Sequence, residues 1–138
     1  MEEFIINETK KIFAKAIKRF AKKDGIEQEN VSILLYLKDG DEGKEVGYKI
    51  CHNHSPNRES RIMEILGVLI DIKGYSMLVP PQIKKIIENF EIELGTADVE
   101  ICVYLDREDD DEVRYFLYKE GTFVKEFHLA DVLKLEIA

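Results

Sequence analysis

The feature that most constrains the fold is an internal repeat, because the second half of the sequence aligns with the first. The stretch VSILLYLKDGDEGKEVGYKIC matches VEICVYLDREDDDEVRYFLY when one residue is skipped in the charged segment. Identical residues stand at Val31 and Val99, Ile33 and Ile101, Tyr36 and Tyr104, Leu37 and Leu105, Glu45 and Glu112, Val46 and Val113, and Tyr48 and Tyr115. Self-similarity of this kind is typical of two similar structural units. The sequence therefore predicts a tandem duplication within a single domain, 1–138, with repeats at about residues 1–73 and 78–138.

Each repeat opens with an amphipathic helix. In the first, expected over residues 3–23, apolar residues recur every three or four positions and so share one face. Gly25 then suits the left-handed position that ends a helix. In the second repeat, Pro80 and Pro81 suit a first helical turn, where a missing amide proton costs little, and Gly95 suits the end.

Two strands follow in each repeat, at residues 31–37 and 45–51 and again at 99–105 and 112–119. Both pairs are rich in β-branched and aromatic residues and enclose a polar turn, which predicts two hairpins. Because successive side chains in a strand point to opposite faces, Tyr36 and Tyr104 are expected on the face away from the core.

The repeats differ after the second strand. In the first, Ser55 and Pro56 resemble a helix cap and first turn, which predicts a helix through Ile72. In the second, KEGTFVKEF predicts a short third strand before a final helix from about Leu129. An apolar connector, KGYSMLV, is expected to be ordered. The predicted fold is α+β: an antiparallel sheet of four strands or more, covered by helices and built around a pseudo-twofold axis.

The sequence favours a cytoplasmic location. No apolar run approaches the roughly 20 residues that cross a membrane, so no membrane association is expected. The first residues, MEEFIINETKK, lack the basic and apolar pattern of a secretory signal. Cys51 and Cys102 fall in strand-like stretches, where small buried hydrophobes are favoured over a disulfide.

The charge is acidic overall but unevenly distributed. The net charge is −8; the first 25 residues carry +3, and the remainder therefore −11. An acidic body repels a polyanion, so nucleic acid is not an expected partner. Lys11, Lys15, Lys18 and Lys22 form a stripe on the first helix. Such a stripe is typical of a solvated face, and the alternative is docking onto an acidic turn of a second molecule in a homodimer.

Acidic residues concentrate in the turns of the two hairpins. Three interpretations stay open for them: a solvated turn, a contact surface for a basic protein, or a site for a hard cation such as Ca²⁺. The EF-hand pattern is absent, because Asp111 stands where that loop needs glycine. The candidate partner-binding residues are Asp106, Glu108, Asp109, Asp110 and Asp111 in the second repeat, and Asp39, Asp41 and Glu42 in the first.

His52 and His54 are weak candidates for metal ligands. Two residues apart on a strand, they would share a face, but the only other histidine, His128, lies in the second repeat. Neither a CxxC nor an HExxH spacing is present, and neither a GxSxG elbow nor a glycine-rich phosphate loop. No catalytic residue and no cofactor is therefore predicted, and an enzyme is the weaker interpretation.

These observations favour a non-enzymatic acidic module that binds a protein, of inhibitor or immunity type, acting on a basic macromolecular surface. Two alternatives remain: a metal-dependent enzyme that uses His52 and His54 with the clustered acids, and a structural homo-oligomer. In composition and size only, the chain is similar to bacterial immunity proteins and phage-borne inhibitors of host defence.

Overall fold

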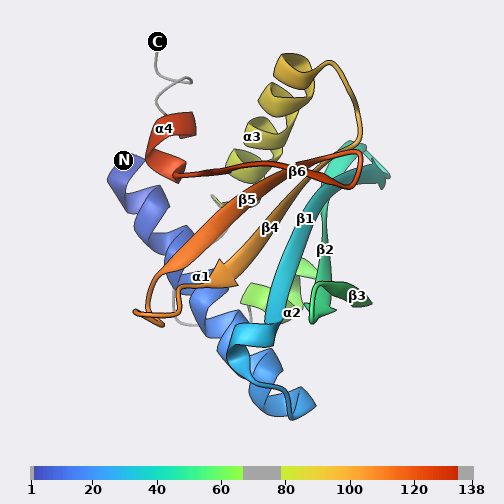
Figure 1. The fold of residues 1–138 in the computed structure, drawn as a ribbon. Helices are drawn as coiled ribbons and strands as arrows, with labels where there is room; N and C mark the ends of the chain where they lie inside the picture. Colours follow the sequence, from blue (N-terminus) through green and yellow to red (C-terminus); the bar gives the residue numbers. More distant parts are fainter. Residues whose placement is uncertain (1, 67–78, 134–138) are drawn as a thin grey trace.

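The structure, a computed structural model, describes residues 2–66 and 79–133 (Figure 1). One antiparallel sheet has the strand order β3-β2-β1-β4-β5-β6. Its strands are β1 (Val31–Gly40), β2 (Gly43–His52), β3 (Ser55–Ser60), β4 (Val99–Leu105), β5 (Val113–Lys119) and β6 (Thr122–Phe127). The helices are α1 (Glu2–Asp24), the single 3₁₀ turn η1 (Gln28–Asn30), α2 (Ile62–Leu66), α3 (Val79–Leu94) and α4 (Leu129–Leu133). The α+β class and the antiparallel sheet are as predicted.

The core lies between the sheet and the helices. Side chains that alternate along the central strands, such as Ile33, Leu35 and Val103, are almost completely buried, as are Ile17 on α1 and Ile87 on α3. Helix α1 contacts β1, β4 and β5, and α3 contacts β1, β2 and β4. In Figure 1, α1, α2 and α3 all lie behind the sheet. Each long helix therefore packs on strands from both halves of the chain.

Both long helices end at a glycine, as the sequence predicted. Gly25 and Gly95 each have a φ of +68°, a backbone angle that residues with a Cβ adopt only with strain. The amide of Ile26 then donates to the carbonyl of Ala21 at 2.9 Å, which satisfies an otherwise free carbonyl at the helix end.

The first half contains a third strand where the sequence predicted the start of a helix. Asn53 and His54 have φ of +52° and +70°, so the chain reverses after β2 and pairs back as β3. Pro56 is tolerated because β3 is an edge strand of the sheet. The helix prediction from Ser55 is therefore wrong, since α2 begins only at Ile62. The predicted end of that helix at Ile72 lies outside the described residues, and so does the connector KGYSMLV except for Val79, the first residue of α3.

The opposite side of the sheet, here called the open face, has no described helix lying over it (Figure 1). Strand alternation places Tyr36 and Tyr104 there, as predicted, because neither belongs to the buried core on the helix side. The other open-face residues include Ser32, Leu34, Lys49, Cys51, Glu100, Cys102, Arg114, Phe116 and Tyr118. Cys51 and Cys102 are free and buried beneath their neighbours.

The two hairpin turns lie at opposite ends of the sheet. The pairing of β1 with β4 runs antiparallel from Ser32 opposite Tyr104 to Tyr36 opposite Glu100, with Leu34 opposite Cys102. The β1–β2 turn therefore extends past the start of β4, and the β4–β5 turn extends past the start of β1, as Figure 1 shows. None of the described helices is both long and apolar enough to cross a membrane.

Candidate functional site

The β4–β5 turn folds back against α1 of the same chain. Lys10 Nζ lies 2.9 Å from Glu112 Oε1, and Lys18 Nζ lies 3.3 Å from Asp111 Oδ1 and 3.5 Å from Asp110 Oδ1. The Gln28 side chain adds a hydrogen bond to Asp110. Part of the acidic charge is thus neutralised within the chain. One member of the predicted lysine stripe, Lys18, already has acidic partners without a second molecule.

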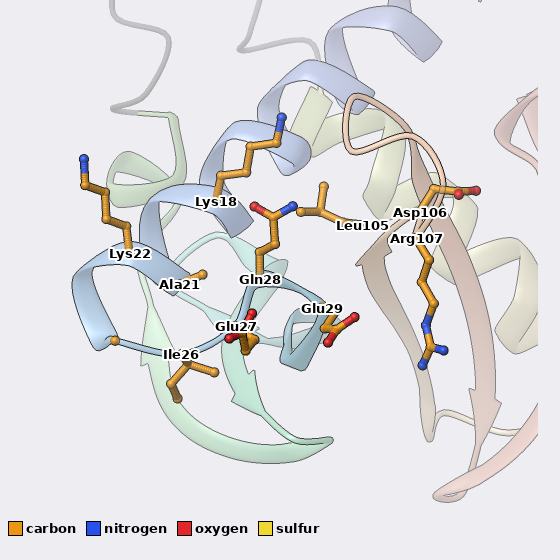
Figure 2. Close-up of a pocket in the computed structure, with 11 residues that line it drawn as sticks. Lys18, Ala21, Lys22, Ile26, Glu27, Gln28, Glu29, Leu105, Asp106 and Arg107 are labelled. Atoms are coloured by element: carbon orange, nitrogen blue, oxygen red, sulfur yellow. The ribbon is translucent and has the colours of Figure 1, made fainter.

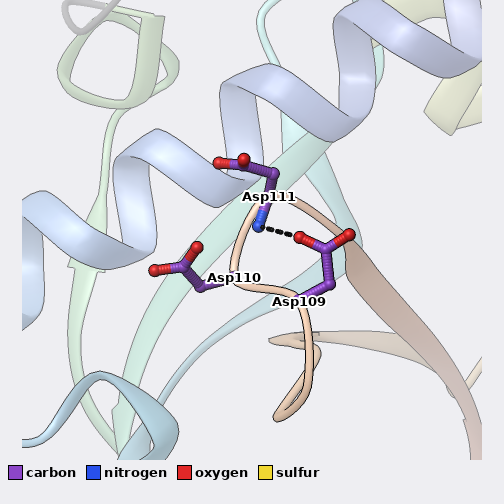
Figure 3. A group of neighbouring side chains, drawn as sticks. All are labelled: Asp109, Asp110 and Asp111. Atoms are coloured by element: carbon purple, nitrogen blue, oxygen red, sulfur yellow. Dashed lines mark hydrogen bonds between the residues drawn. The ribbon is translucent and has the colours of Figure 1, made fainter.

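Three consecutive carboxylates of this turn lie close together (Figure 3). One ligand oxygen from each of Asp109, Asp110 and Asp111 falls within 4.8 Å of the others. All three residues are exposed, and the Asp111 amide donates to Asp109 Oδ1 at 3.1 Å. Ca²⁺ takes six to eight oxygen ligands, and the Lys18 ammonium competes for the same carboxylates. With one oxygen from each residue, the triplet supplies three ligands, which is half or less of that number.

The β1–β2 turn carries the second acidic group. Lys44 pairs with Asp39 at 2.8 Å, and its hydrogen bond lowers the pKa of the Asp39 carboxyl. Asp41 and Glu42 are exposed and form no ion pair with other described residues. Together with Asp39 and Glu45 they line a shallow hollow. The carboxylates of Asp41 and Glu42 are therefore available to a partner at this end of the sheet.

An aromatic cluster, Tyr104, Phe116, Tyr118 and Phe123, covers the second half of the open face. Tyr104 meets Phe116 edge-on with ring centroids 5.4 Å apart, and Phe123 lies 5.9 Å from Tyr118 and 6.1 Å from Phe116. Phe123 is 52% exposed. Sequence reasoning missed Phe116, Tyr118 and Phe123. Alternation along β5, which puts Phe116 and Tyr118 on the same face as Tyr104, was the signal that could have found these two.

A cavity of about 360 Å³, here called the open-face pocket, adjoins this cluster. His54 enters it from the β2–β3 turn, where its Nδ1 forms a hydrogen bond with the Tyr104 hydroxyl. Burial raises the pKa of that hydroxyl, so it stays neutral near pH 7. The pocket is lined by Glu29, Asn30, His54, Tyr104, Leu105, Arg107, Arg114, Phe116 and Tyr118.

The two arginines of the open-face pocket differ in their contacts. Arg114 forms a fork with Glu126, at 2.9 Å from Nε and 2.7 Å from Nη2, and its guanidinium lies 5.3 Å from the Phe116 ring centre. The hydrogen bonds between the two side chains raise the pKa of Arg114 and lower the pKa of Glu126. Arg107 has no ion pair with the other described residues.

A larger cavity of about 650 Å³ lies between the end of α1, η1 and the β4–β5 turn (Figure 2). Its charged walls are mixed in sign, with Lys18, Lys22 and Arg107 set against Glu27, Glu29 and Asp106. Such balanced walls favour neither a cation nor an anion. None of the residues that line it is a cysteine, serine or histidine. Its titratable lining therefore consists of carboxylates, lysines and one arginine.

His52 and His54, the weak candidates for metal ligands, do not share a face. His52 Nε2 lies 2.9 Å from Asp24 Oδ2 at the end of α1, on the helix side, whereas His54 contacts Tyr104 on the open face. The left-handed backbone at Asn53 and His54 separates them, because the strand alternation that would align them ends at β2. His128 lies at a third place, beside α4. Among the described residues, the aspartate triplet is the only group with three such ligand atoms together.

The cysteines are placed for packing and not for catalysis. Burial raises the pKa of the Cys51 thiol to about 11, and it also raises the pKa of Cys102. A thiol that stays protonated at neutral pH is a poor nucleophile.

Comparison with known proteins adds no family to this description. No family model matches the chain, and neither a curated protein nor a solved structure shows significant similarity to it.

Proposed function

We propose that the protein is a non-enzymatic binding module that engages a basic protein partner across its open face. The observation that supports this most is the arrangement of that face: an aromatic cluster with no described helix lying over it, between two acidic turns at opposite ends of the sheet. Contiguous exposed apolar surface on a soluble protein commonly marks an interaction site, and aromatic residues dominate the energy of such sites.

The unpaired acids on this protein favour a partner whose contact surface is positively charged. Asp41 and Glu42 at one end, and Glu108 and Asp109 at the other, are acids without ion pairs to other described residues. In a chain with a net charge of −8 they direct a negative field toward any approaching surface. Such fields accelerate the association of oppositely charged proteins more than they raise affinity.

The length of the sheet determines the distance that the partner has to span. Strand β1 has 10 residues, which at about 3.3 Å per residue separates the two ends of the sheet by roughly 30 Å. A partner that contacts both acidic turns therefore spans the aromatic cluster between them. Simultaneous contact at both ends makes the second contact intramolecular, which strengthens binding.

We also propose that the two halves arose by duplication around a pseudo-twofold axis. The order helix, three strands, helix occurs in residues 2–66 and again in 79–133. In the sequence alignment Leu34 corresponds to Cys102, and these two residues pair with each other across β1 and β4. Pairing of a residue with its own counterpart is what a twofold axis at that position requires.

The duplication has its own test by segment exchange. Replacing residues 99–105 by the sequence of 31–37 should preserve a folded chain, because the same side chains face the core in the same register. The same segment inserted one residue out of register should prevent folding, because every side chain then changes face. Circular dichroism and thermal unfolding distinguish the two. Equal stability of both variants would contradict the duplication.

The binding function is tested by kinetics on a partner captured from a nuclease-treated lysate of the source cells. A variant with Asp41→Asn, Glu42→Gln, Glu108→Gln and Asp109→Asn should associate at least about tenfold more slowly at low salt, with a flatter salt dependence. The control makes the same type of change at the exposed residues Glu3 and Asp131 on α1 and α4. If the control variant slows association by as much per removed charge, the effect reflects net charge alone and the proposal is contradicted.

A further inference from the structure

We infer that the open-face pocket receives one uncharged aromatic side chain of the partner, as a single anchor beside a basic segment. This inference rests on the proposed function and specifies the chemistry of the partner. The partner is then a segment with an aromatic residue next to one cluster of lysine or arginine and a second basic cluster farther along.

The size and walls of the pocket favour a ring. At about 360 Å³ the pocket lies at the small end of the range for binding cavities, which suits one large side chain more than a whole ligand. Tyr104, Phe116 and Tyr118 form its floor, and Tyr104 already meets Phe116 edge-on. Another ring can add the same edge or offset contacts while it displaces water from an apolar surface.

The charges in the pocket give a basic anchor no net attraction. Arg107 and Glu29 line it with opposite charges, and Arg114, which also lines it, is paired with Glu126. A lysine or arginine placed there would lose its water without a surplus of negative charge to compensate, which costs affinity. The basic residues of the partner therefore belong outside the pocket, at the acidic turns. The pocket adjoins the β4–β5 turn through Leu105 and Arg107, so one basic cluster lies close to the anchor.

The equivalent place in the described first half of the sheet is packed differently. Opposite Tyr104 on the neighbouring strand stands Arg114, whereas opposite Tyr36 stands Gly47. The Tyr36 ring occupies the space over Gly47, where a Cβ would lie only 2.4 Å from the ring. Lys49 then lies 4.8 Å from the Tyr36 ring centre, in a place where the second half has an aromatic residue. The two halves are therefore unequal on this face, and one anchor binds per chain.

Because this chain contains no tryptophan, the fluorescence of a tryptophan in a peptide probe can be followed on its own. The probe is a helical peptide of about 20 residues, long enough to span roughly 30 Å, with lysines at both ends and one tryptophan near one lysine cluster. We expect its emission to shift to the blue on titration with the full-length protein, saturating at one peptide per chain. A dye-labelled version with alanine in place of tryptophan should bind at least about tenfold more weakly by anisotropy.

Matched variants locate the anchor. Tyr118→Ser, in the pocket, should reduce the affinity of the tryptophan peptide to that of the alanine peptide, and the exposed His54→Ala should reduce it as well. Tyr36→Ser makes the same change on the same face outside the pocket and should leave affinity unchanged. Thermal unfolding of each variant verifies that it is folded. If Tyr36→Ser weakens binding as much as Tyr118→Ser does, the pocket is not the anchor site and the inference fails.

The remaining outcomes separate the inference from the proposed function. Equal binding of the tryptophan and alanine peptides, with unshifted emission, would overturn the anchor and leave the acidic binding module standing. No binding of either peptide at low salt would overturn both. Self-association in sedimentation that Tyr118→Ser abolishes would assign the pocket to a second copy of this chain, and binding of single-stranded RNA in preference to the peptide would assign it to a nucleic acid. Either result would overturn the inference.

Discussion

Gly47 is the described glycine at which an added Cβ would meet the closest neighbour. A Cβ there would lie 2.4 Å from Cζ of Tyr36 and 2.5 Å from Cε2, so the ring has to move. We expect Gly47→Ala to lower the free energy of unfolding by about 1–3 kcal/mol, the usual cost of overpacking, as measured by urea denaturation.

Two controls distinguish this clash from a general effect of the substitution. At Gly40 an added Cβ meets the flexible end of the exposed Glu45 side chain, so Gly40→Ala should cost much less. In a chain that already carries Tyr36→Ala, Gly47→Ala should also cost much less, since the obstructing ring is gone. An unchanged cost in that background would show that the Tyr36 ring is not the cause.

Glu100, on the open face between Tyr36 and Tyr118, should make stability depend on pH. Burial raises its pKa above the ordinary 4.5, and the nearby Asp98 adds to the effect. An acid with a raised pKa in the folded state destabilises that state as pH rises through and above the unfolded value. Glu100→Gln should therefore increase the free energy of unfolding at pH 7, and the gain should disappear below about pH 4.

Glu126 gives the matched control with the opposite sign. Its hydrogen bond with Arg114 lowers its pKa, so it stabilises the fold above the unfolded pKa and loses that effect as pH falls through the folded value. Glu126→Gln should be destabilising at pH 7 and neutral in acid, by urea denaturation across pH. Parallel pH profiles for the two variants would contradict both assignments.

At the level of single residues, alternation in the sequence predicted more than composition did. The positions of Tyr36 and Tyr104 followed from the strand period alone, and the burial of Cys51 and Cys102 followed from their strand-like apolar surroundings. The aromatic cluster was within reach of the same argument. The separation of His52 from His54 could not be predicted in this way. It depends on the backbone angles of Asn53 and His54, which the types of these two residues do not require.

Among the elements, β3 illustrates where a local signal misleads. Ser55 and Pro56 suit a helix start, yet they suit an edge strand equally well. What decides is the neighbouring strand: β2 is long enough to offer pairing partners to residues 55–60, with a bulge between Ile50 and Cys51. Pairing across the sheet is a tertiary effect that overrides a local preference, so a local pattern could not settle it.

The contact between α1 and the β4–β5 turn is a second property that the sequence left open. Lys10 and Lys18 meet Glu112 and Asp111 from opposite halves of the chain. Exposed ion pairs contribute little, so a Lys10→Gln and Lys18→Gln variant should lose well under about 1 kcal/mol per pair in urea denaturation. The loss should shrink further in high salt, because salt screens exposed charges. A loss of several kcal/mol that salt leaves unchanged would mean that the turn is held more firmly than its exposure implies.

On the scale of the whole molecule, the halves depend on each other. Helix α1 of the first half packs on β4 and β5 of the second, and α3 packs on β1 and β2 of the first. We expect a fragment of residues 1–75 and one of 76–138 to be unfolded when separate, by circular dichroism. Mixed together, they should recover helical and strand signals, because the β1–β4 pairing and both helix contacts can form between them.

The opposite outcome would be informative about the fold. A cooperative thermal transition in either fragment alone would mean that one half builds a sufficient core without the other. A scrambled version of the second fragment, mixed with the first, controls for nonspecific collapse.

The crossing of α1 onto the second half also affects how the chain is made. Helix α1 emerges from the ribosome long before β5 is synthesised. The apolar face of this helix therefore lacks its final neighbours while most of the chain is still being made. At about 5–20 residues per second that interval lasts several seconds. During this time the nascent chain depends on provisional contacts or on chaperones to cover the helix, and truncated translation products would expose it permanently.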